Sequence, residues 1–144
     1  MKTKLTTLAL SLLCTLAFGH VGVEIGPNGG RVLEVSKNGT IHGEVTVKDG
    51  KFHVAVLDKD MKPVKLDQQV LTATTGDRKS PQKLEVTKDG KGFTLPLVKE
   101  GGLLILQFKL NPDSKAVTAR LEYDTSNCDG CDSPEWLCKC APAK

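Results

Sequence analysis

Three things are scarce in this sequence: excess charge of one sign, long apolar runs and side chains arranged for catalysis. Its 20 basic and 17 acidic residues give a formal net charge of +3, too small a bias for a surface that binds nucleic acid or an anionic membrane. After residue 19, no apolar stretch reaches the roughly 18–20 residues that a membrane-spanning helix needs. The three histidines are not spaced as paired ligands, and no serine or cysteine has a recognisable base motif. The sequence therefore predicts a protein that is not an enzyme.

The first residues have the composition of a secretory signal peptide. Lys2 and Lys4 form a charged start, Leu5 to Phe18 is apolar, and Ala17-Phe18-Gly19 supplies the small residues of a cleavage site. Cleavage after Gly19 makes His20 the first residue of the exported chain, and cleavage two residues earlier is the alternative. Losing both lysines leaves 20 − 2 = 18 basic residues against 17 acidic ones, a net charge of +1. We expect a periplasmic or secreted protein; an uncleaved anchor is disfavoured because the apolar segment is shorter than a membrane span.

The rest of the chain is predicted to be one all-β domain with a tail. Between residues 31 and 123 the apolar residues recur with a period near two, and turn residues separate the runs. The eight candidate strands are Arg31 to Val35, Thr40 to Lys48, Lys51 to Leu57, Gln69 to Thr75, Gln82 to Lys88, Lys91 to Leu97, Leu103 to Leu110 and Ala116 to Asp124. We predict a single antiparallel two-sheet sandwich, immunoglobulin-like, with a small barrel as the alternative. The predicted divisions are a signal peptide (1–19), the sandwich (20–124) and a cysteine-rich tail (125–144).

Asp49-Gly50 predicts a tight hairpin turn that fixes the pairing of its two strands. Asp-Gly supplies the positive φ angles that such turns require. A two-residue turn pairs Lys48 with Lys51 and, further along, His42 with Leu57. The core face then carries Val45, Val47, Phe52, Val54 and Val56. The opposite face carries His42, Glu44 and His53.

Other local patterns predict the surroundings of this hairpin. Pro96 cannot donate a ladder hydrogen bond and predicts an edge strand. The run Leu103 to Leu106 is apolar on both faces and predicts a central strand that is covered on both sides. Residues 21–30 form a flexible lead-in. Within it, Gly26 to Gly30 indicates a rigid turn rather than a phosphate loop, because it lacks the Gly-Lys-Ser/Thr ending and precedes a strand.

Histidines supply the first candidate metal site. If His20 starts the exported chain, its α-amine and imidazole offer copper(II) two nitrogen donors, and a histidine in third position also binds copper(II) or nickel(II). The His42 and His53 rings start roughly 14 Å apart at about 3.4 Å per residue, so they cannot share one ion. Glu44 is the better local partner for either histidine. Copper is the predicted ion, with His53 the least favoured ligand, and ordinary solvated histidines are the alternative.

Four cysteines in the tail supply the second candidate site. Cys128, Cys131, Cys138 and Cys140 form a Cys-x₂-Cys and a Cys-x-Cys pair separated by six residues. In an exported segment this arrangement predicts two disulfides. A bond between Cys138 and Cys140 would be strained, which leaves Cys128–Cys138 with Cys131–Cys140, or Cys128–Cys140 with Cys131–Cys138. The alternative is a four-thiolate site for zinc or copper(I), although zinc ribbons place roughly 15–20 residues between their pairs.

The remaining tail residues bear on the same choice. A thioredoxin-like redox pair is disfavoured because Asp129 and Asp132 oppose thiolate formation and no helix is predicted after the cysteines. Trp136 and Leu137 are expected to pin the loop to the sandwich, over the outer face of the Leu103 strand.

Several short motifs between residue 20 and about residue 66 carry a family resemblance. They are Gly26-Pro27-Asn28-Gly29-Gly30-Arg31, His42-x-Glu44, Lys48-Asp49-Gly50 and Val56-Leu57-Asp58-x-Asp60-x-Lys62-Pro63-Val64. They resemble the small domain at the N-terminus of periplasmic adaptor subunits of heavy-metal (RND-type) efflux pumps, which is also found in short exported bacterial proteins. The resemblance implies a periplasmic β-domain associated with transition metals, with histidines at positions 20 and 42 and an envelope or efflux protein as partner. The cysteine tail lies outside this pattern, and the adaptor's coiled-coil hairpin and lipoyl domain have no counterpart.

These patterns predict two functions from different classes. The first is an exported, non-enzymatic protein that holds or transfers a transition-metal ion, with copper favoured over zinc. The second is a disulfide-stapled sandwich that acts as a protein-interaction module of the cell envelope without metal.

Overall fold

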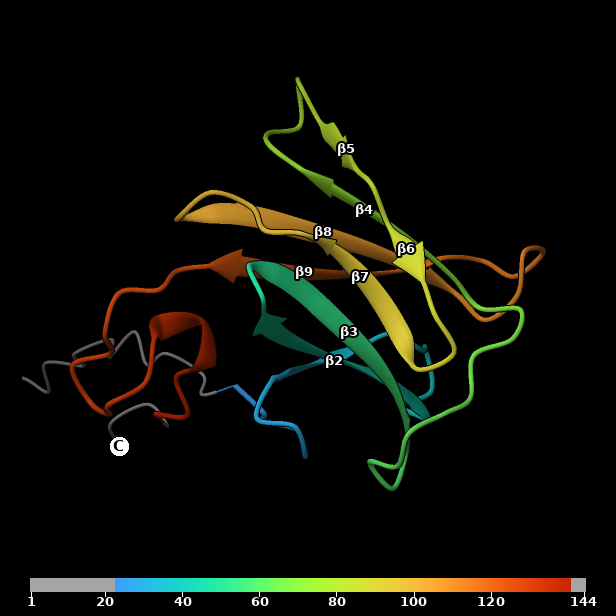
Figure 1. The fold of residues 1–144 in the computed structure, drawn as a ribbon, viewed down its shortest axis with the longest axis horizontal. Helices are drawn as coiled ribbons and strands as arrows, with labels where there is room; N and C mark the ends of the chain where they lie inside the picture. The colour runs from blue at the N-terminus through green and yellow to red at the C-terminus, as the bar shows by residue number, and fades with distance from the viewer. Residues whose placement is uncertain (1–22, 141–144) are drawn as a thin grey trace, which may run out of the picture.

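The computed structural model describes residues 23–140, which form nine strands and one short 3₁₀ helix (Figure 1). The strands are β1 (Arg31–Glu34), β2 (Ile41–Lys48), β3 (Lys51–Asp58), β4 (Val70–Thr75), β5 (Gln82–Leu84), β6 (Thr87–Lys88), β7 (Gly92–Pro96), β8 (Gly102–Lys109) and β9 (Val117–Tyr123). The helix is η1 (Glu135–Leu137). No helix within residues 23–140 has the length and apolarity to cross a membrane.

The strands form two antiparallel sheets. One sheet has the order β1-β2-β3-β7-β6 and the other has the order β5-β4-β8-β9. The predicted two-sheet sandwich is therefore confirmed. The segment after β9, which carries the cysteines, lies at one end of the sandwich beside the first described residues of the chain (Figure 1).

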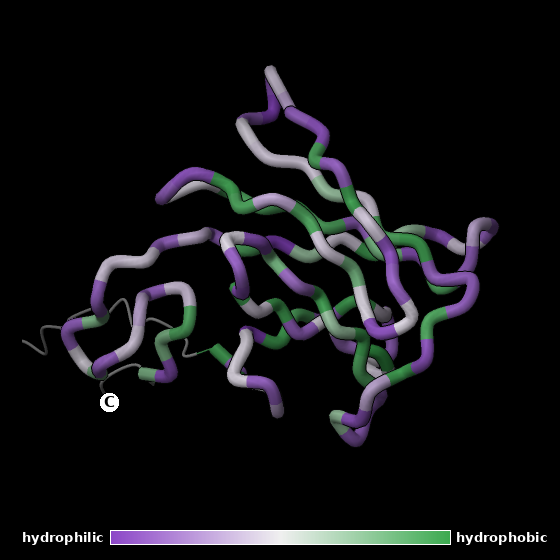
Figure 2. Tube along the Cα trace, viewed as in Figure 1, coloured by the Kyte–Doolittle hydropathy of each residue, from purple (hydrophilic) through white to green (hydrophobic). Residues whose placement is uncertain are grey.

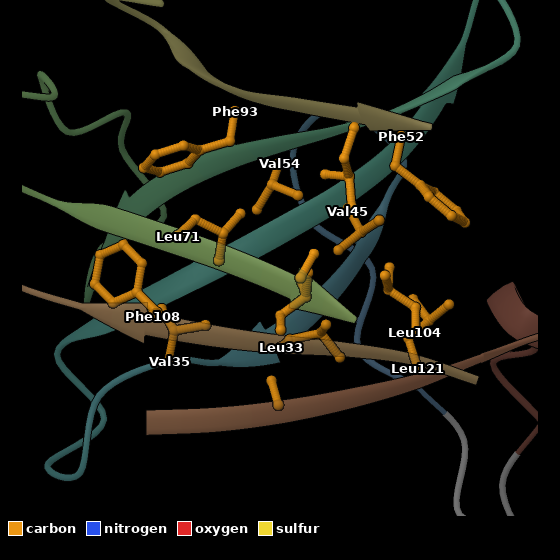
Figure 3. Close-up of a cluster of buried hydrophobic side chains, with 14 of the residues drawn as sticks. Leu33, Val35, Val45, Phe52, Val54, Leu71, Phe93, Leu104, Phe108 and Leu121 are labelled. Carbon is orange, nitrogen blue, oxygen red and sulfur yellow. The ribbon is translucent and has the colours of Figure 1, made fainter. Parts of the chain in front are cut away.

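Apolar side chains from both sheets fill the space between them (Figure 3). The largest fully buried apolar side chains are Phe52, Leu57, Leu95, Leu104, Leu106, Leu121, Val45 and Val56. Apolar residues concentrate on the strands, whereas the turns are mostly hydrophilic (Figure 2). Burial of this kind is the main favourable term in folding, so the sandwich has its own source of stability.

The Asp49-Gly50 hairpin has the predicted register. Lys48 lies opposite Lys51 and His42 opposite Leu57. Asp49 and Gly50 adopt φ angles of 51° and 69°, the left-handed conformation that the turn requires.

The predicted division into core and solvent faces is wrong at two positions of β2. Val47, expected on the core face, is 38% exposed and lies only two residues before the Asp49-Gly50 turn at the end of the hairpin. Glu44 was assigned to the solvent face but is 0% exposed. It does point away from the core, but the turn formed by residues 26–30 covers it.

One of the eight predicted strands forms two separate strands in the structure. The segment Gln82 to Lys88 splits into β5, which pairs with β4, and β6, which pairs with β7 in the other sheet. The prediction that Pro96 marks an edge strand is also wrong, because β7 has β3 on one side and β6 on the other. The β6 pairing reaches only Thr94, so Pro96 itself faces no partner on that side.

The run Leu103 to Leu106 is central, as predicted, because β8 lies between β4 and β9. It is not fully covered on its second face, where Leu103 and Ile105 are half-buried. Trp136 of the tail contacts Tyr123 instead of lying over this face. Trp136 and Leu137 do pin the tail to the sandwich, as predicted, but the place is different: Trp136 enters the end of the core.

Candidate metal centre

Aromatic contacts attach the tail to the sandwich. Trp136 is 5% exposed, and its ring meets Tyr123 edge-on at a centroid distance of 5.6 Å. Tyr123 in turn meets Phe52 of the core at 5.0 Å. Edge-on pairs at these distances are favourable beyond the area they bury. η1 thus has a fixed position at the end of the core.

Backbone hydrogen bonds set the path of the tail up to η1. The Trp136 N–H donates to the Asp124 carbonyl, and the Glu135 N–H donates to the Ser126 carbonyl. The hydroxyl and N–H of Ser126 also donate to the Asp124 carboxylate, which lowers the pKa of that group. An isolated antiparallel bridge joins Asn127 to Pro134. The segment between them is therefore a closed loop, and it begins with the Cys-x₂-Cys pair.

The four cysteine sulfurs meet where this loop faces the residues after η1. The Sγ atoms of Cys128 and Cys138 lie 2.8 Å apart, those of Cys128 and Cys140 3.6 Å, and those of Cys131 and Cys138 3.8 Å. All four lie within 4.8 Å of one another, as free thiols. In the part of the chain that the structure describes, this is the only group of three or more histidine, cysteine or acidic side chains placed to hold a metal ion. Cys138 is buried and the other three are half-buried.

Gly130, inside the Cys-x₂-Cys turn, lets Cys140 come close. A Cβ atom at this position would lie 2.7 Å from the Cys140 sulfur and 3.9 Å from the Cys128 sulfur. The φ angle of Gly130 is not in the left-handed region, so the need for glycine is one of space. The sequence alone predicted no role for Gly130.

Hydrogen bonding among the thiols redistributes their acidity. Burial acts to raise the pKa of Cys131, but hydrogen bonds from Cys140, Cys128, Cys138 and the Ser133 N–H outweigh it and lower that pKa to about 7. Hydrogen bonding to Cys128 raises the pKa of Cys138, and hydrogen bonding to Cys138 raises the pKa of Cys140. One thiolate near neutral pH is thus stabilised by its protonated neighbours.

The chain before β1 also holds the centre in place. The Val23 N–H donates to the Cys138 carbonyl at 2.9 Å, and Arg31 Nη1 donates to the Trp136 carbonyl at 3.4 Å. Burial lowers the pKa of Arg31, and the charge of Glu122 opposes that shift. Residues far apart in sequence therefore converge on η1 and Cys138.

Glu44 organises the turn that positions this N-terminal segment. Its Oε1 accepts hydrogen bonds from the Asn28 N–H (2.7 Å) and the Gly30 N–H (2.9 Å), and its Oε2 accepts one from Asn28 Nδ2 (2.7 Å). A Cβ on Gly26 would lie 2.5 Å from the Glu44 carboxyl carbon, and one on Gly30 would lie 2.3 Å from the Val45 carbonyl oxygen. The rigid turn at residues 26–30 is confirmed, whereas a flexible lead-in is wrong for residues 23–30. The sequence offered only the glycines as a signal; it did not indicate that the acidic side chain lies beneath them.

The two histidines within residues 23–140, His42 and His53, are not brought together. His42 Nδ1 lies 3.5 Å from Glu34 Oε2, opposite it on β1, and His53 Nδ1 lies 3.3 Å from Thr94 Oγ1 on β7. Glu44, with its carboxylate directed to the turn, pairs with neither. His20 lies outside the described residues. Among the predicted ligands, the structure assembles only the cysteines into one group.

Four sulfurs at these separations suit two kinds of chemistry. A tetrahedral ion with metal–sulfur bonds of about 2.3 Å places its ligand sulfurs about 3.8 Å apart, which two of the observed distances match. The shorter Cys128–Cys138 distance lies nearer to the bond length of a disulfide, about 2.05 Å. The site is able to hold a thiophilic ion when reduced. No protein-family model, curated protein or solved structure matches this chain.

Proposed function

We propose that this protein is exported and binds one thiophilic metal ion through Cys128, Cys131, Cys138 and Cys140, holding or passing on the ion without catalysing a reaction. The observation that carries the proposal is the convergence of four sulfurs within 4.8 Å. Soft thiolate ligands select copper(I) and zinc among the common ions. The three half-buried sulfurs remain accessible to a thiol-bearing partner, which suits transfer as well as storage.

Copper is the first candidate ion and zinc the second. Copper is supported by the family resemblance of residues 20–66 and by the amine and imidazole that His20 offers after cleavage. The Val23 N–H donates to the Cys138 carbonyl, and two residues lie between Val23 and His20, so the three backbone steps that join them span at most about 11 Å. The proposal therefore includes His20 as an additional copper ligand near the cysteines, with an efflux or other envelope protein as partner.

Metal analysis of the exported protein tests the proposal. The processed protein is purified under anaerobic conditions, its intact mass is measured with and without alkylation, and bound copper and zinc are quantified on the same sample. We expect one ion per chain, and its loss in Cys138→Ser. The variants His42→Ala and His53→Ala serve as controls and retain the ion, while His20→Ala lowers affinity for copper but not for zinc. A reduced protein that takes up neither ion at micromolar concentration contradicts the proposal.

The disulfide-stapled interaction module is the second candidate function. It is favoured by one observation, the 2.8 Å separation of the Cys128 and Cys138 sulfurs. This function predicts an exported protein with two disulfides and no bound metal. Reducing its cysteines and loading them with a metal ion would then abolish partner binding. The same mass measurement distinguishes it, because each disulfide lowers the mass by two hydrogens and blocks alkylation.

A further inference from the structure

We infer that the cysteine centre alternates between a metal-binding thiol form and a metal-free disulfide form, and that Cys128 and Cys138 make the first disulfide. This inference rests on the proposed metal-binding function. It adds a mechanism by which the ion is released: oxidation of two ligands by an organic disulfide.

The sulfur distances select the first pair. The Cys128 and Cys138 sulfurs are 2.8 Å apart, so they need to move less than 1 Å to reach a disulfide bond length of about 2.05 Å. The other two measured pairs are separated by 3.6 and 3.8 Å. A bond between Cys138 and Cys140 would close a ring over a single residue, which strains disulfide geometry.

The backbone also favours this pair, because both of its members are held in place before any bond forms. The Cys128 N–H donates to the Ser133 carbonyl, and the Cys138 N–H donates to the Glu135 carbonyl. The Cys138 carbonyl accepts from Val23. The Cys140 N–H, by contrast, donates to the Cys138 sulfur, so its position depends on the centre itself.

The exchange balances as follows. In the metal-bound form the cysteine ligands are thiolates. The half-buried Cys128 thiolate attacks a disulfide R–S–S–R, forms a mixed disulfide and releases one RS⁻. The buried Cys138 thiolate then attacks the Cys128 sulfur, closes the Cys128–Cys138 bond and releases the second RS⁻. Two cysteine thiolates are oxidised by two electrons, and one R–S–S–R is reduced to two thiolates.

Loss of this pair leaves too few ligands to keep the ion. Cys131 and Cys140 remain, and within residues 23–140 no other histidine, cysteine or acidic side chain joins the group. The ion leaves, and the two remaining thiolates take up one proton each, or form the second disulfide by exchange with a second R–S–S–R, which is reduced to two RS⁻. Metal retention and the Cys128–Cys138 bond therefore exclude each other.

Zinc-loaded full-length protein tests the inference, because zinc has no redox chemistry of its own. Oxidised glutathione is added in steps, released zinc is measured with a chromophoric chelator, and samples are alkylated and mapped by mass spectrometry. We expect one zinc released for each first disulfide, with Cys128 joined to Cys138. A different first pair, or zinc still bound after one disulfide per chain, overturns the inference.

Gly130→Ala separates the two forms of the centre. Its Cβ would displace the Cys140 sulfur, which lies 2.7 Å from that position, without reaching Cys138. Zinc affinity is expected to fall at least tenfold, while the rate of forming the Cys128–Cys138 disulfide stays within twofold of the parent. Gly90→Ala is the matched control, because a Cβ there has no neighbour within 4 Å.

The outcomes separate the two proposals. A reduced chain that takes up no zinc or copper overturns the proposed function. A chain that binds zinc and keeps it through oxidation overturns the release inference and leaves the proposed function standing. If Gly130→Ala slows the Cys128–Cys138 reaction as much as it weakens zinc binding, the first-pair assignment is wrong.

Discussion

The sandwich and the cysteine tail are held together by different means. The sandwich buries large apolar side chains from two sheets, and its core cluster contains no sulfur-bearing side chain. The tail has one buried aromatic residue, Trp136, a single turn of 3₁₀ helix and a set of backbone hydrogen bonds. We therefore expect the sandwich to fold without the metal centre, whereas the geometry of the centre depends on its contacts with the sandwich.

The two regions meet along the aromatic series Phe52, Tyr123 and Trp136. The first belongs to the core, the last to the tail, and the middle residue ends β9. A substitution at Phe52 is expected to act on the stability of the whole protein, whereas a substitution at Trp136 is expected to act on both stability and the cysteine centre.

The largest effect is expected for Phe52→Ala. Phe52 is fully buried between the sheets, and removing such a ring costs about 4 kcal/mol of unfolding free energy. Urea denaturation of the metal-free, reduced protein measures this loss. Val47→Ala on the neighbouring strand is the control: its side chain is 38% exposed, so the loss is about 1 kcal/mol or less. Equal losses in the two variants would show that the hairpin faces are assigned incorrectly.

Trp136→Ala is expected to lower the free energy of unfolding, measured by urea denaturation, by about 3 kcal/mol. This is the low end of the range for a buried tryptophan, because the residue lies at the end of the core. It also frees η1 from Tyr123, so zinc affinity falls while the strand content measured by circular dichroism stays unchanged. Leu110→Ala, at a residue that is 53% exposed, is the control and alters neither property. Normal zinc affinity in Trp136→Ala would mean that the tail forms its centre without docking.

Glu44→Gln is expected to cost about 2 kcal/mol, because a neutral amide replaces a buried carboxylate that accepts three hydrogen bonds. Denaturation measures the loss. Glu85→Gln, an exposed residue between β5 and β6, is the matched control and changes stability by less than about 0.5 kcal/mol. A loss no greater than that of the control would contradict the role of Glu44 in fixing the turn at residues 26–30.

The smallest effect is a pH dependence confined to the tail of the metal-free, reduced protein. The folded-state pKa of Cys131 is about 7, below its ordinary value of 9.0. The stability that this group contributes is therefore fully present above pH 9 and is lost as the pH falls through about 7. The alkylation rate of Cys131 should rise with a midpoint near pH 7, while Cys140, whose pKa is raised, stays unreactive there. A Cys131 midpoint at the ordinary thiol value would contradict the thiol network.

Sequence patterns predicted the sandwich well because its signals are local. Alternating apolar residues and the Asp49-Gly50 turn determine the hairpin and its register without knowledge of the rest of the chain. The prediction failed where another segment intervenes. Glu44 is buried by residues 26–30, and the segment Gln82 to Lys88 divides because each half finds a partner in a different sheet.

The candidate site was only partly predictable for the same reason. The spacing of the cysteines indicated that they lie close together, but not whether all four meet at one point. That depends on the docking of Trp136, the hydrogen bond from Val23 to Cys138 and the close approach at Gly130. The sequence indicated that Trp136 docks on the sandwich but not where, and the other two contacts have no periodic or motif signal.

Trp136 is the single tryptophan of the chain and lies two residues before Cys138. Its fluorescence therefore comes from the junction between the sandwich and the sulfur centre, without a background from other indoles. A change in its emission when a metal ion is added, or when the cysteines are oxidised, reports directly on the tail. Metal binding and oxidation can therefore each be followed in real time on unlabelled protein.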